Sequence, residues 1–369
     1  MSGGFIPLVD LKAQLDDIRE EIDAGFDQVI SNTAFVLGPQ VRAFEEAFAR
    51  CSGVPHCIGV GNGTDALELA VRALGIGPGD EVIVPANTFI ASALAIQRAG
   101  ATPVLVDCDP EHHLIDVSAI EARVGERTRA IMPVHLYGQM APMERVLEVA
   151  HRRGLAVIED AAQSQGASRN GGPAGSVGRV AGTSFYPGKN LGAFGDAGAV
   201  LTADDAIAKK VRALRNYGSE VKYHHPETGF NSRLDTLQAV VLNAKLIRLE
   251  AWNGMRRDAA ARYEALLVDL TDVGRPGTLE GNEHVWHLYV IRVSGRDRVL
   301  EKLQAAGIGA GIHYPVPIHL QGAFAHLGHR RGDFPITEKA ADEILSLPLF
   351  PEITEAQQER VVAALRTAL

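Results

Sequence analysis

The chain has 369 residues, of which 46% are hydrophobic and 22% are charged, and its formal net charge is -9. These values are typical of globular domains, and the acidic balance without a long basic run argues against a nucleic-acid groove. The three cysteines, Cys51, Cys57 and Cys108, lack CxxC spacing, so we expect neither a metal site nor a disulfide framework. Without a signal-peptide pattern or an apolar run long enough to span a membrane, the default expectation is a cytoplasmic enzyme with no membrane contact.

The first half of the chain alternates short apolar strands with helices, after a segment from about residue 10 to 50 with helical spacing. Strands are predicted at 57–60, 81–84, 103–107, 130–134 and 155–159, and helices at 65–74 and 90–98. Repeated βαβ units predict an α/β fold, in which a mostly parallel central sheet carries helices on both faces. Ligands of such sheets bind in the loops at the carboxyl ends of the strands.

The pattern changes near residue 245. A long helix is predicted over 237–252, then a strand over 286–293, a helix over 298–306 and a last helix at the C-terminus. We therefore expect a large domain over residues 1–245, including an N-terminal helical arm, and a smaller C-terminal α+β domain over residues 246–369.

Lys189 and Asp160 form the most informative pair of residues. Lys189 lies in the sequence TSFYPGKN just after a short predicted strand, and the strand predicted at 155–159 runs directly into Asp160. A lysine amine can form a Schiff base with the aldehyde of pyridoxal 5'-phosphate. A buried carboxylate can keep the pyridine nitrogen protonated, so that the ring acts as an electron sink. The pair predicts this cofactor, with Lys189 and Asp160 as catalytic residues.

Other side chains in order around this pair could contact the cofactor. Gly63 and Thr64 lie in the sequence GNGTD between a strand and a helix, where free N–H groups favour phosphate. Phe89 follows the next strand, and its flat ring could stack on the pyridine. Gln163 could hydrogen-bond the ring hydroxyl, and Ser184 offers a hydroxyl to the phosphate. Each of them alone also suits packing or a loop, so the prediction depends on their occurring together.

The ordered motifs GNGTDAL, NTF, EDAAQS and SFYPGKN resemble those of the DegT/DnrJ/EryC1/StrS family of sugar-nucleotide aminotransferases. The resemblance runs from PLVDL, which starts at residue 7, to LPLFP, which ends at residue 351, and it includes VHLYGQ, GFNSRLDTLQ and HYPVPIH. It implies the aspartate aminotransferase-like, type I fold of pyridoxal phosphate enzymes. It also implies that Lys189 holds the cofactor and shuttles a proton, that Asp160 pairs with the ring nitrogen, and that the other residues named above hold the ring and phosphate.

The same resemblance implies an assembly and a substrate. Asn231 matches an asparagine that, in the family, reaches the phosphate from the neighbouring subunit, which implies a homodimer with shared active sites. L-glutamate would donate the amino group to a nucleotide-linked keto-sugar. The segments FGDAG and YHH resemble members that aminate C3 of a dTDP-3-keto-6-deoxyhexose, giving a dTDP-3-amino-3,6-dideoxyhexose. Candidate contacts to the sugar or diphosphate, each of which could equally be a packing or surface residue, are Tyr217, Lys222, His225, Tyr314 and His319.

Several alternatives stay open. The substrate could be a UDP-linked 3-keto sugar, or amination could occur at C4, although many relatives that aminate C4 read GEGG after the lysine. A sugar dehydratase of this family would carry histidine in place of Lys189. A non-catalytic regulatory relative would have lost that lysine or gained a DNA-binding module. A nicotinamide dehydrogenase would need a GxGxxG turn in its first βα unit, which this sequence lacks.

Overall fold

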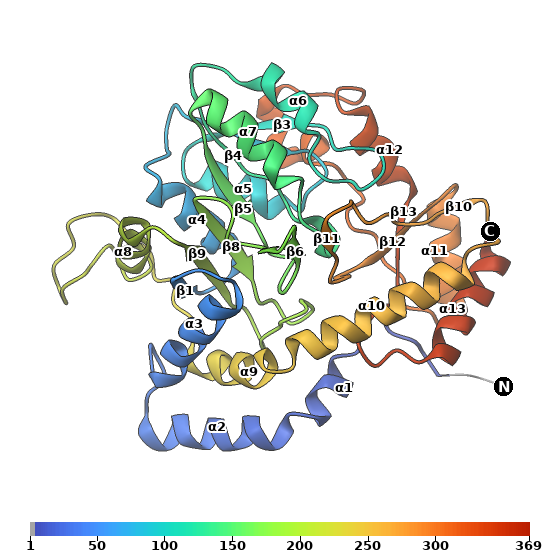
Figure 1. The fold of residues 1–369 in the computed structure, drawn as a ribbon, viewed down its shortest axis with the longest axis horizontal. Coiled ribbons are helices and arrows are strands. Elements are labelled where there is room, and N and C mark those ends of the chain that lie inside the picture. Colours follow the sequence, from blue (N-terminus) through green and yellow to red (C-terminus); the bar gives the residue numbers. More distant parts are fainter. Residues whose placement is uncertain (1–3) are drawn as a thin grey trace.

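The computed structural model describes residues 4–369, with a central sheet and a row of long helices along one side (Figure 1). The chain begins with three helices, α1 (Leu11–Asp16), α2 (Arg19–Asn32) and α3 (Pro39–Cys51). Asp10 caps the first of them, because its carboxylate accepts the N–H groups of Lys12 and Ala13. The segment predicted to be helical from about residue 10 to 50 therefore contains three separate helices.

A seven-stranded sheet lies at the centre, in the order β1-β9-β8-β5-β4-β2-β3. In chain order its strands are β1 (His56–Val60), β2 (Glu81–Pro85), β3 (Thr102–Val106), β4 (Thr128–Ile131), β5 (Ala156–Asp160), β8 (Val180–Ser184) and β9 (Gly198–Thr202). Neighbours from β8 to β3 pair in parallel, and β9 is antiparallel to both β1 and β8. The mostly parallel sheet is confirmed.

Successive side chains of the strands enter cores on opposite faces of this sheet, as their alternating direction requires. Val82 and Val84 of β2 join one core, while Ile83 between them joins another. The helices that contribute to the first core are α4 (Gly63–Ala73), α5 (Ile90–Arg98) and α8 (Asp205–Leu214). Those of the second are α6 (Val117–Ile120) and α7 (Met143–Arg153), and a third core lies against α3 and α9 (Thr236–Leu246). The predicted helices on both faces are therefore present.

The C-terminal part has a hydrophobic core of its own, built on a three-stranded antiparallel sheet in the order β10-β12-β13. Its elements are α10 (Leu249–Leu266), β10 (Val273–Gly274), β12 (Tyr289–Val293), α11 (Arg296–Ala305), α12 (Pro335–Glu343), β13 (Ile344–Leu347) and α13 (Glu355–Ala368). Ile6 also enters this core: it pairs with Ile308 and is 2% exposed. The domain boundary near residue 245 stays a prediction; it falls in the last turn of α9.

Short elements complete the chain. A small sheet joins β6 (Ser168–Arg169), β7 (Gly172–Pro173) and β11 (Asn282–Glu283). Four 3-10 helices are η1 (Glu121–Arg123), η2 (Leu136–Gly138), η3 (Ile318–Leu320) and η4 (Gly322–Leu327).

Two predicted elements differ from the structure. The single helix predicted over 237–252 is wrong: α9 ends at Leu246 and α10 begins at Leu249, so the chain can pass from the contacts with α2 and α3 to the C-terminal core. The strand predicted from residue 286 begins only at Tyr289, because Trp286 has a φ of 47°, which is incompatible with an extended strand.

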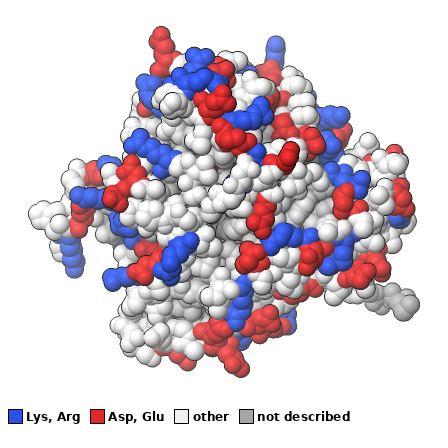
Figure 2. All heavy atoms as spheres, viewed as in Figure 1, with Lys and Arg blue, Asp and Glu red and all other residues white. Residues whose placement is uncertain are grey.

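Acidic and basic side chains are interspersed on the face shown in Figure 2, rather than gathered into a patch of one sign. Exposed charges of opposite sign also pair, as Arg152 does with Glu148 and Glu121. The expectation that no nucleic acid binds stays a prediction. Among the helices of residues 4–369, none combines the length and the apolar character needed to cross a membrane.

Candidate active site

A cavity of about 390 Å³ lies at the carboxyl ends of several strands of the central sheet. This is the edge at which parallel α/β sheets bind ligands, because the loops that follow the strands converge there. The predicted site residues that line the cavity are Gly63, Thr64, Phe89, Asp160, Gln163, Ser184, Lys189 and Tyr314. Segments distant in the sequence therefore bring these side chains together within one chain.

Lys189 lies in a turn just after β8, where its N–H donates to the carbonyl of Tyr186 at 2.8 Å. Within residues 4–369 its amine makes no hydrogen bond or ion pair, and the side chain faces the cavity. Burial lowers the pKa of Lys189 to about 8, and the carboxylate of Asp160 opposes this shift. A lysine with this pKa is partly unprotonated near neutral pH and can act as a nucleophile.

Asp160 is the last residue of β5 and is 4% exposed. The hydroxyl of Ser92 donates to its Oδ2 at 2.6 Å, and the N–H of Ala162 donates to its Oδ1 at 3.1 Å. Burial raises the pKa of Asp160, while these two hydrogen bonds and the charge of Lys189 act in the opposite direction. A buried carboxylate held in this way suits a cationic partner such as a protonated ring nitrogen.

The start of α4 provides an anion site at one wall of the cavity. Asn62 caps the helix by accepting the N–H of Asp65 at 2.8 Å, whereas the first N–H groups of a helix have no acceptor within the helix. Gly63 is required here, because a Cβ at this position would lie 2.5 Å from the Cβ of Ser184. The close approach of α4 and β8 puts the helix start beside the hydroxyl of Ser184, an arrangement that suits phosphate.

Aromatic and amide groups form another wall. Phe89 is 48% exposed, and its ring centroid lies 5.1 Å from that of Tyr314. Gln163 is held on both sides: its Oε1 accepts the N–H of Tyr137 at 2.7 Å, and its Nε2 donates to the hydroxyl oxygen of Tyr314 at 2.9 Å. The second hydrogen on Nε2 remains available for a ligand oxygen.

These groups fit pyridoxal phosphate. The amine of Lys189 suits the aldehyde, Asp160 suits the ring nitrogen, the ring of Phe89 suits the pyridine face, and the start of α4 suits the phosphate. The individual roles assigned to these residues stay predictions, because the fit is one of chemistry and location.

The segment that carries Tyr217, Lys222 and His225 lies outside this cavity. The three residues line a separate, open hollow of about 830 Å³. Its lining residues all come from the part of the sequence between α8 and Asn231. His225 donates from Nδ1 to the carbonyl of Tyr217 at 2.9 Å, which closes the segment on itself. Asn231 is exposed and contacts Arg233. A single chain therefore does not bring these four predicted residues to Lys189.

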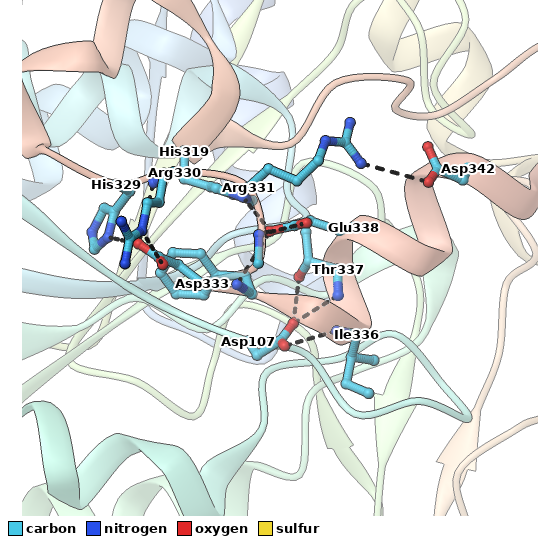
Figure 3. A network of polar contacts seen from close by, with 12 residues as sticks. Asp107, His319, His329, Arg330, Arg331, Asp333, Ile336, Thr337, Glu338 and Asp342 are labelled. Carbon is cyan, nitrogen blue, oxygen red and sulfur yellow. Dashed lines mark hydrogen bonds and ion pairs between the residues drawn. The ribbon is translucent and has the colours of Figure 1, made fainter.

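His319 lies in an environment that differs from the predicted substrate contact. Its side chain is fully buried, and its Nε2 lies 2.9 Å from Oε1 of Glu338 in a polar network (Figure 3) whose labelled residues do not line the cavity. Glu338 also accepts N–H groups from Gly332 and Phe334. In the same network Asp107 caps α12 by accepting the N–H groups of its first turn. An imidazole enclosed in this way presents no surface to a sugar, so the predicted substrate contact is not supported and a packing role is.

Sequence reasoning missed three polar residues of the site. Ser92 lies one helical turn from Thr88, and the two hydroxyls are 2.8 Å apart, so helical spacing after NTF was the available signal. His287 and His313 line the cavity from the C-terminal part of the chain. His313 belongs to the HYPVPIH motif named above, but no local feature of the sequence indicated that either histidine would line the same cavity as Lys189.

A mostly parallel sheet with a cavity lysine and a buried aspartate at its carboxyl edge defines a pyridoxal phosphate enzyme of the aspartate aminotransferase-like, type I fold. The chain belongs to the DegT/DnrJ/EryC1/StrS aminotransferase family, whose sequence model matches residues 16–366. It is a pyridoxal phosphate-dependent aminotransferase, as the family and its cofactor-bound structures indicate.

Several curated proteins are similar over nearly their whole length. A dTDP-3-amino-3,4,6-trideoxy-alpha-D-glucose transaminase of Streptomyces venezuelae is 46% identical, over 98% of this chain and 95% of the relative. A UDP-N-acetyl-3-dehydro-alpha-D-glucosamine 3-aminotransferase of Acidithiobacillus ferrooxidans is 48% identical, over 99% and 98%. A protein of Geobacillus stearothermophilus named pleiotropic regulatory protein is 48% identical, over 97% and 96%.

The fold agrees with that of a solved relative. The crystal structure of S. venezuelae DesV in complex with a ketimine intermediate superimposes with a TM-score of 0.97 at 46% identity. The match covers 99% of this chain and 98% of that chain. The arrangement of both parts of the chain is therefore that of a sugar aminotransferase family member.

Proposed function

We propose that this aminotransferase transfers the amino group of L-glutamate to C3 of a nucleotide-linked keto-deoxysugar, with dTDP-3-keto-6-deoxyhexose as the preferred substrate. The product would be the dTDP-3-amino-3,6-dideoxyhexose. The observation that carries the proposal is the amine of Lys189, which has no partner within residues 4–369 and faces Asp160 across a cavity suited to pyridoxal phosphate. Support for the substrate comes from relatives named as dTDP-3-amino-sugar transaminases at 45–46% identity.

The chain's own residues divide the chemistry. Pyridoxal phosphate, when bound, supplies an electron sink and carries the amino group between the two substrates. Lys189 takes a proton from the carbon that loses the amine and returns one to the carbon that gains it, a task that needs an amine with a pKa near neutrality. Asp160 holds a proton at the ring nitrogen. The start of α4 and Ser184 bind the phosphate, and Phe89 orients the ring.

The proposal includes a homodimer with shared sites. Asn231, Tyr217, Lys222 and His225 lie away from their own chain's cavity, so a partner chain is needed to bring them to a cofactor and its sugar. Lys222 would suit the diphosphate of the sugar nucleotide, because its ammonium group is a compact positive charge that donates hydrogen bonds. A cytoplasmic location is part of the same proposal.

The test is the visible absorption spectrum of the purified protein before and after L-glutamate. The expected result is a cofactor band that L-glutamate converts to the amine form of the cofactor, followed by recovery on adding a dTDP-3-keto sugar but little recovery with the dTDP-4-keto sugar. Absence of any band even with added pyridoxal phosphate would contradict the role of Lys189 and favour a regulatory protein.

A UDP-linked 3-keto sugar is the second candidate. The relative from A. ferrooxidans, which is 48% identical, is named as an aminotransferase of such a sugar. The same experiment separates the two: faster recovery with the UDP-linked sugar would replace dTDP by UDP in the proposal. Recovery with the 4-keto sugar alone would move the reaction from C3 to C4.

A further inference from the structure

Ser232 joins the loop before α4 to the segment that carries Asn231. Its hydroxyl oxygen accepts the N–H of Gly61 at 3.0 Å, and its hydroxyl hydrogen is donated to Oδ2 of Asp65 at 2.7 Å. Both directions are fixed, because an N–H can only donate and a carboxylate can only accept. Ser232 is 2% exposed and follows Asn231 directly in the sequence. One buried hydroxyl therefore connects two parts of the chain that are about 170 residues apart.

These contacts leave two N–H groups free at the start of α4. On one side the loop is held by Ser232, and on the other the N–H of Asp65 donates to Oδ1 of Asn62 at 2.8 Å. The N–H groups of Gly63 and Thr64 lie between these two points and make no hydrogen bond within residues 4–369. They belong to the two residues predicted to hold the cofactor phosphate. The loop is therefore fixed on both sides of a free pair of donors that suits an anion.

The contact continues along one face of α4. Asp65 and Arg72 are two helical turns apart, so both face the same side of the helix. The guanidinium of Arg72 lies 5.1 Å from the ring centroid of Phe230, which precedes Ser232 by two residues. A guanidinium nitrogen of Arg98 lies 3.3 Å from Oδ1 of Asp65 and balances its charge near the anion site. The segment is therefore attached to α4 at two points, one of them at the phosphate end of the helix.

Asn231 keeps its amide nitrogen free. The guanidinium of Arg233 donates to Oδ1 of Asn231, so both hydrogens on the amide nitrogen are left for another acceptor. The backbone on either side is held, because Asn231 pairs with Asn216 and the N–H of Ser232 donates to the carbonyl of Arg215 at 3.0 Å. An exposed amide with two free hydrogens on a fixed backbone suits a phosphate of another chain's cofactor.

We propose that Ser232 is a positioning residue for the cofactor phosphate in both sites of the homodimer. Through Gly61 and Asp65 it fixes the start of α4 in its own chain. Through the adjacent peptide bond it fixes Asn231, which serves the site of the partner chain. The inference rests on the proposed function in one respect, that Asn231 reaches the phosphate bound by the partner. Loss of the hydroxyl should therefore weaken both sites at the phosphate alone.

The first experiment titrates cofactor-free protein with pyridoxal phosphate and, separately, with pyridoxal, which lacks the phosphate. The absorption band of the bound cofactor gives a Kd for each. Ser232→Ala should raise the Kd for pyridoxal phosphate by roughly tenfold, the scale of a lost buried hydrogen bond, and leave the Kd for pyridoxal within about twofold. Equal weakening of both ligands would mean that Ser232 only stabilises the fold. That result, or an unchanged Kd for pyridoxal phosphate, would overturn the proposal.

The matched control is Ser219→Ala. Ser219 belongs to the same segment, is 7% exposed, and donates its hydroxyl hydrogen to the carbonyl of Val221 at 2.6 Å. Within the described residues that hydroxyl makes no hydrogen bond to α4 or to the loop before it. Its loss should leave both Kd values near those of the wild type. A rise in the Kd for pyridoxal phosphate as large as that of Ser232→Ala would show that any damage to the segment disturbs the phosphate, and the proposed role of Ser232 would be wrong.

The second experiment separates the two sites. Mixed dimers are isolated through a different affinity tag on each chain, and one chain carries Lys189→Ala, so that the cofactor band reports only the site of the other chain. Ser232→Ala in the chain that keeps Lys189 tests that chain's own site. Ser232→Ala in the Lys189→Ala chain tests how well Asn231 is presented to the partner. Each arrangement should raise the Kd for pyridoxal phosphate about threefold, because two separate effects add as free energies. No change in either arrangement would contradict the double role.

The same titrations distinguish this inference from the proposed function, since they need neither a sugar nor an amino donor. A wild type without any cofactor band, or without a dimer, would overturn the proposed function and this inference with it. A normal band in a dimeric wild type, together with an unchanged Kd in Ser232→Ala, would overturn this inference alone.

Discussion

The cavity around Lys189 and the segment from Asn216 to Asn231 are both rich in polar side chains, but they differ in completeness. In the cavity, strand ends and the start of α4 bring every predicted cofactor group except Asn231 together within one chain. The other segment faces outward, with Tyr223 81% exposed and Val221 63% exposed. These exposed side chains belong to the surface that the proposed dimer would cover. In the proposed homodimer, one chain supplies most of the cofactor contacts, and the 216–231 segment of the other chain supplies Asn231 and the candidate sugar contacts.

The largest expected effect is that of Lys189→Ala. Removal of the only cavity amine among the described residues should lower kcat by at least about a thousandfold, because both proton transfers and covalent attachment of the cofactor are lost. Steady-state kinetics with L-glutamate and the keto-sugar would measure it. Circular dichroism should show an intact fold. A variant that retains wild-type turnover would contradict the assignment of Lys189 as the catalytic amine of the cavity.

Subunit mixing tests whether Asn231 of the 216–231 segment acts in the partner's cavity. Asn231→Ala alone should lower kcat by roughly tenfold to a hundredfold, through loss of a hydrogen bond to a charged group. When Asn231→Ala and Lys189→Ala proteins are unfolded and refolded together, half of the sites in mixed dimers should contain neither change. Activity should then recover to about a quarter of the wild type if chains associate at random. A mixture no more active than the average of its parents would show that Asn231 serves its own chain.

Lys222→Met should affect the sugar only. Loss of a charge-assisted contact to the diphosphate should raise the KM for the nucleotide sugar by about tenfold, with the L-glutamate half-reaction unchanged. Lys209→Met is the control, because Lys209 is an exposed lysine of α8 that pairs with Glu220 of the same segment but does not line the hollow. Equal effects of the two substitutions would indicate general electrostatics rather than a site at the 216–231 segment.

The smallest effect is expected from Asp107→Ala. Asp107 accepts the N–H groups of Ile336 and Thr337 at 3.0 and 2.8 Å and so caps α12 from the end of β3, but it does not line the cavity (Figure 3). Its loss should lower the free energy of unfolding by about 1–2 kcal/mol in urea titrations and leave kcat within about twofold. Asp342→Ala, which breaks an exposed pair with Arg331, should cost less than about 0.5 kcal/mol. A large fall in kcat for Asp107→Ala would indicate that this network also supports catalysis.

Strand periodicity and turn residues were enough to predict the sheet, its binding edge and the joint location of Lys189 and Asp160. These features are local, because each residue follows its own strand at a fixed edge of the sheet. The break between α9 and α10 was missed because Ile247 and Arg248 carry no helix-breaking signal; tertiary packing overrides helix propensity there.

The environments of His319 and His287 could not be predicted for a related reason. A histidine in a loop motif has the same local pattern whether it faces a ligand or is enclosed. His319 is buried by its contact with Glu338, nineteen positions further along the chain, whereas His287 reaches the cavity through a contact with Asn190. Both outcomes depend on long-range packing, which short sequence windows do not contain.

The pairing of Ile6 with Ile308 has a consequence for synthesis on the ribosome. Ile6 emerges about 300 residues before Gly307 and Gly309, with which it exchanges hydrogen bonds. The C-terminal core therefore cannot close while translation is still in progress upstream of residue 308. Until then the nascent chain must keep an apolar N-terminal segment uncovered, and a prematurely terminated product would leave it permanently exposed to aggregation or to chaperones.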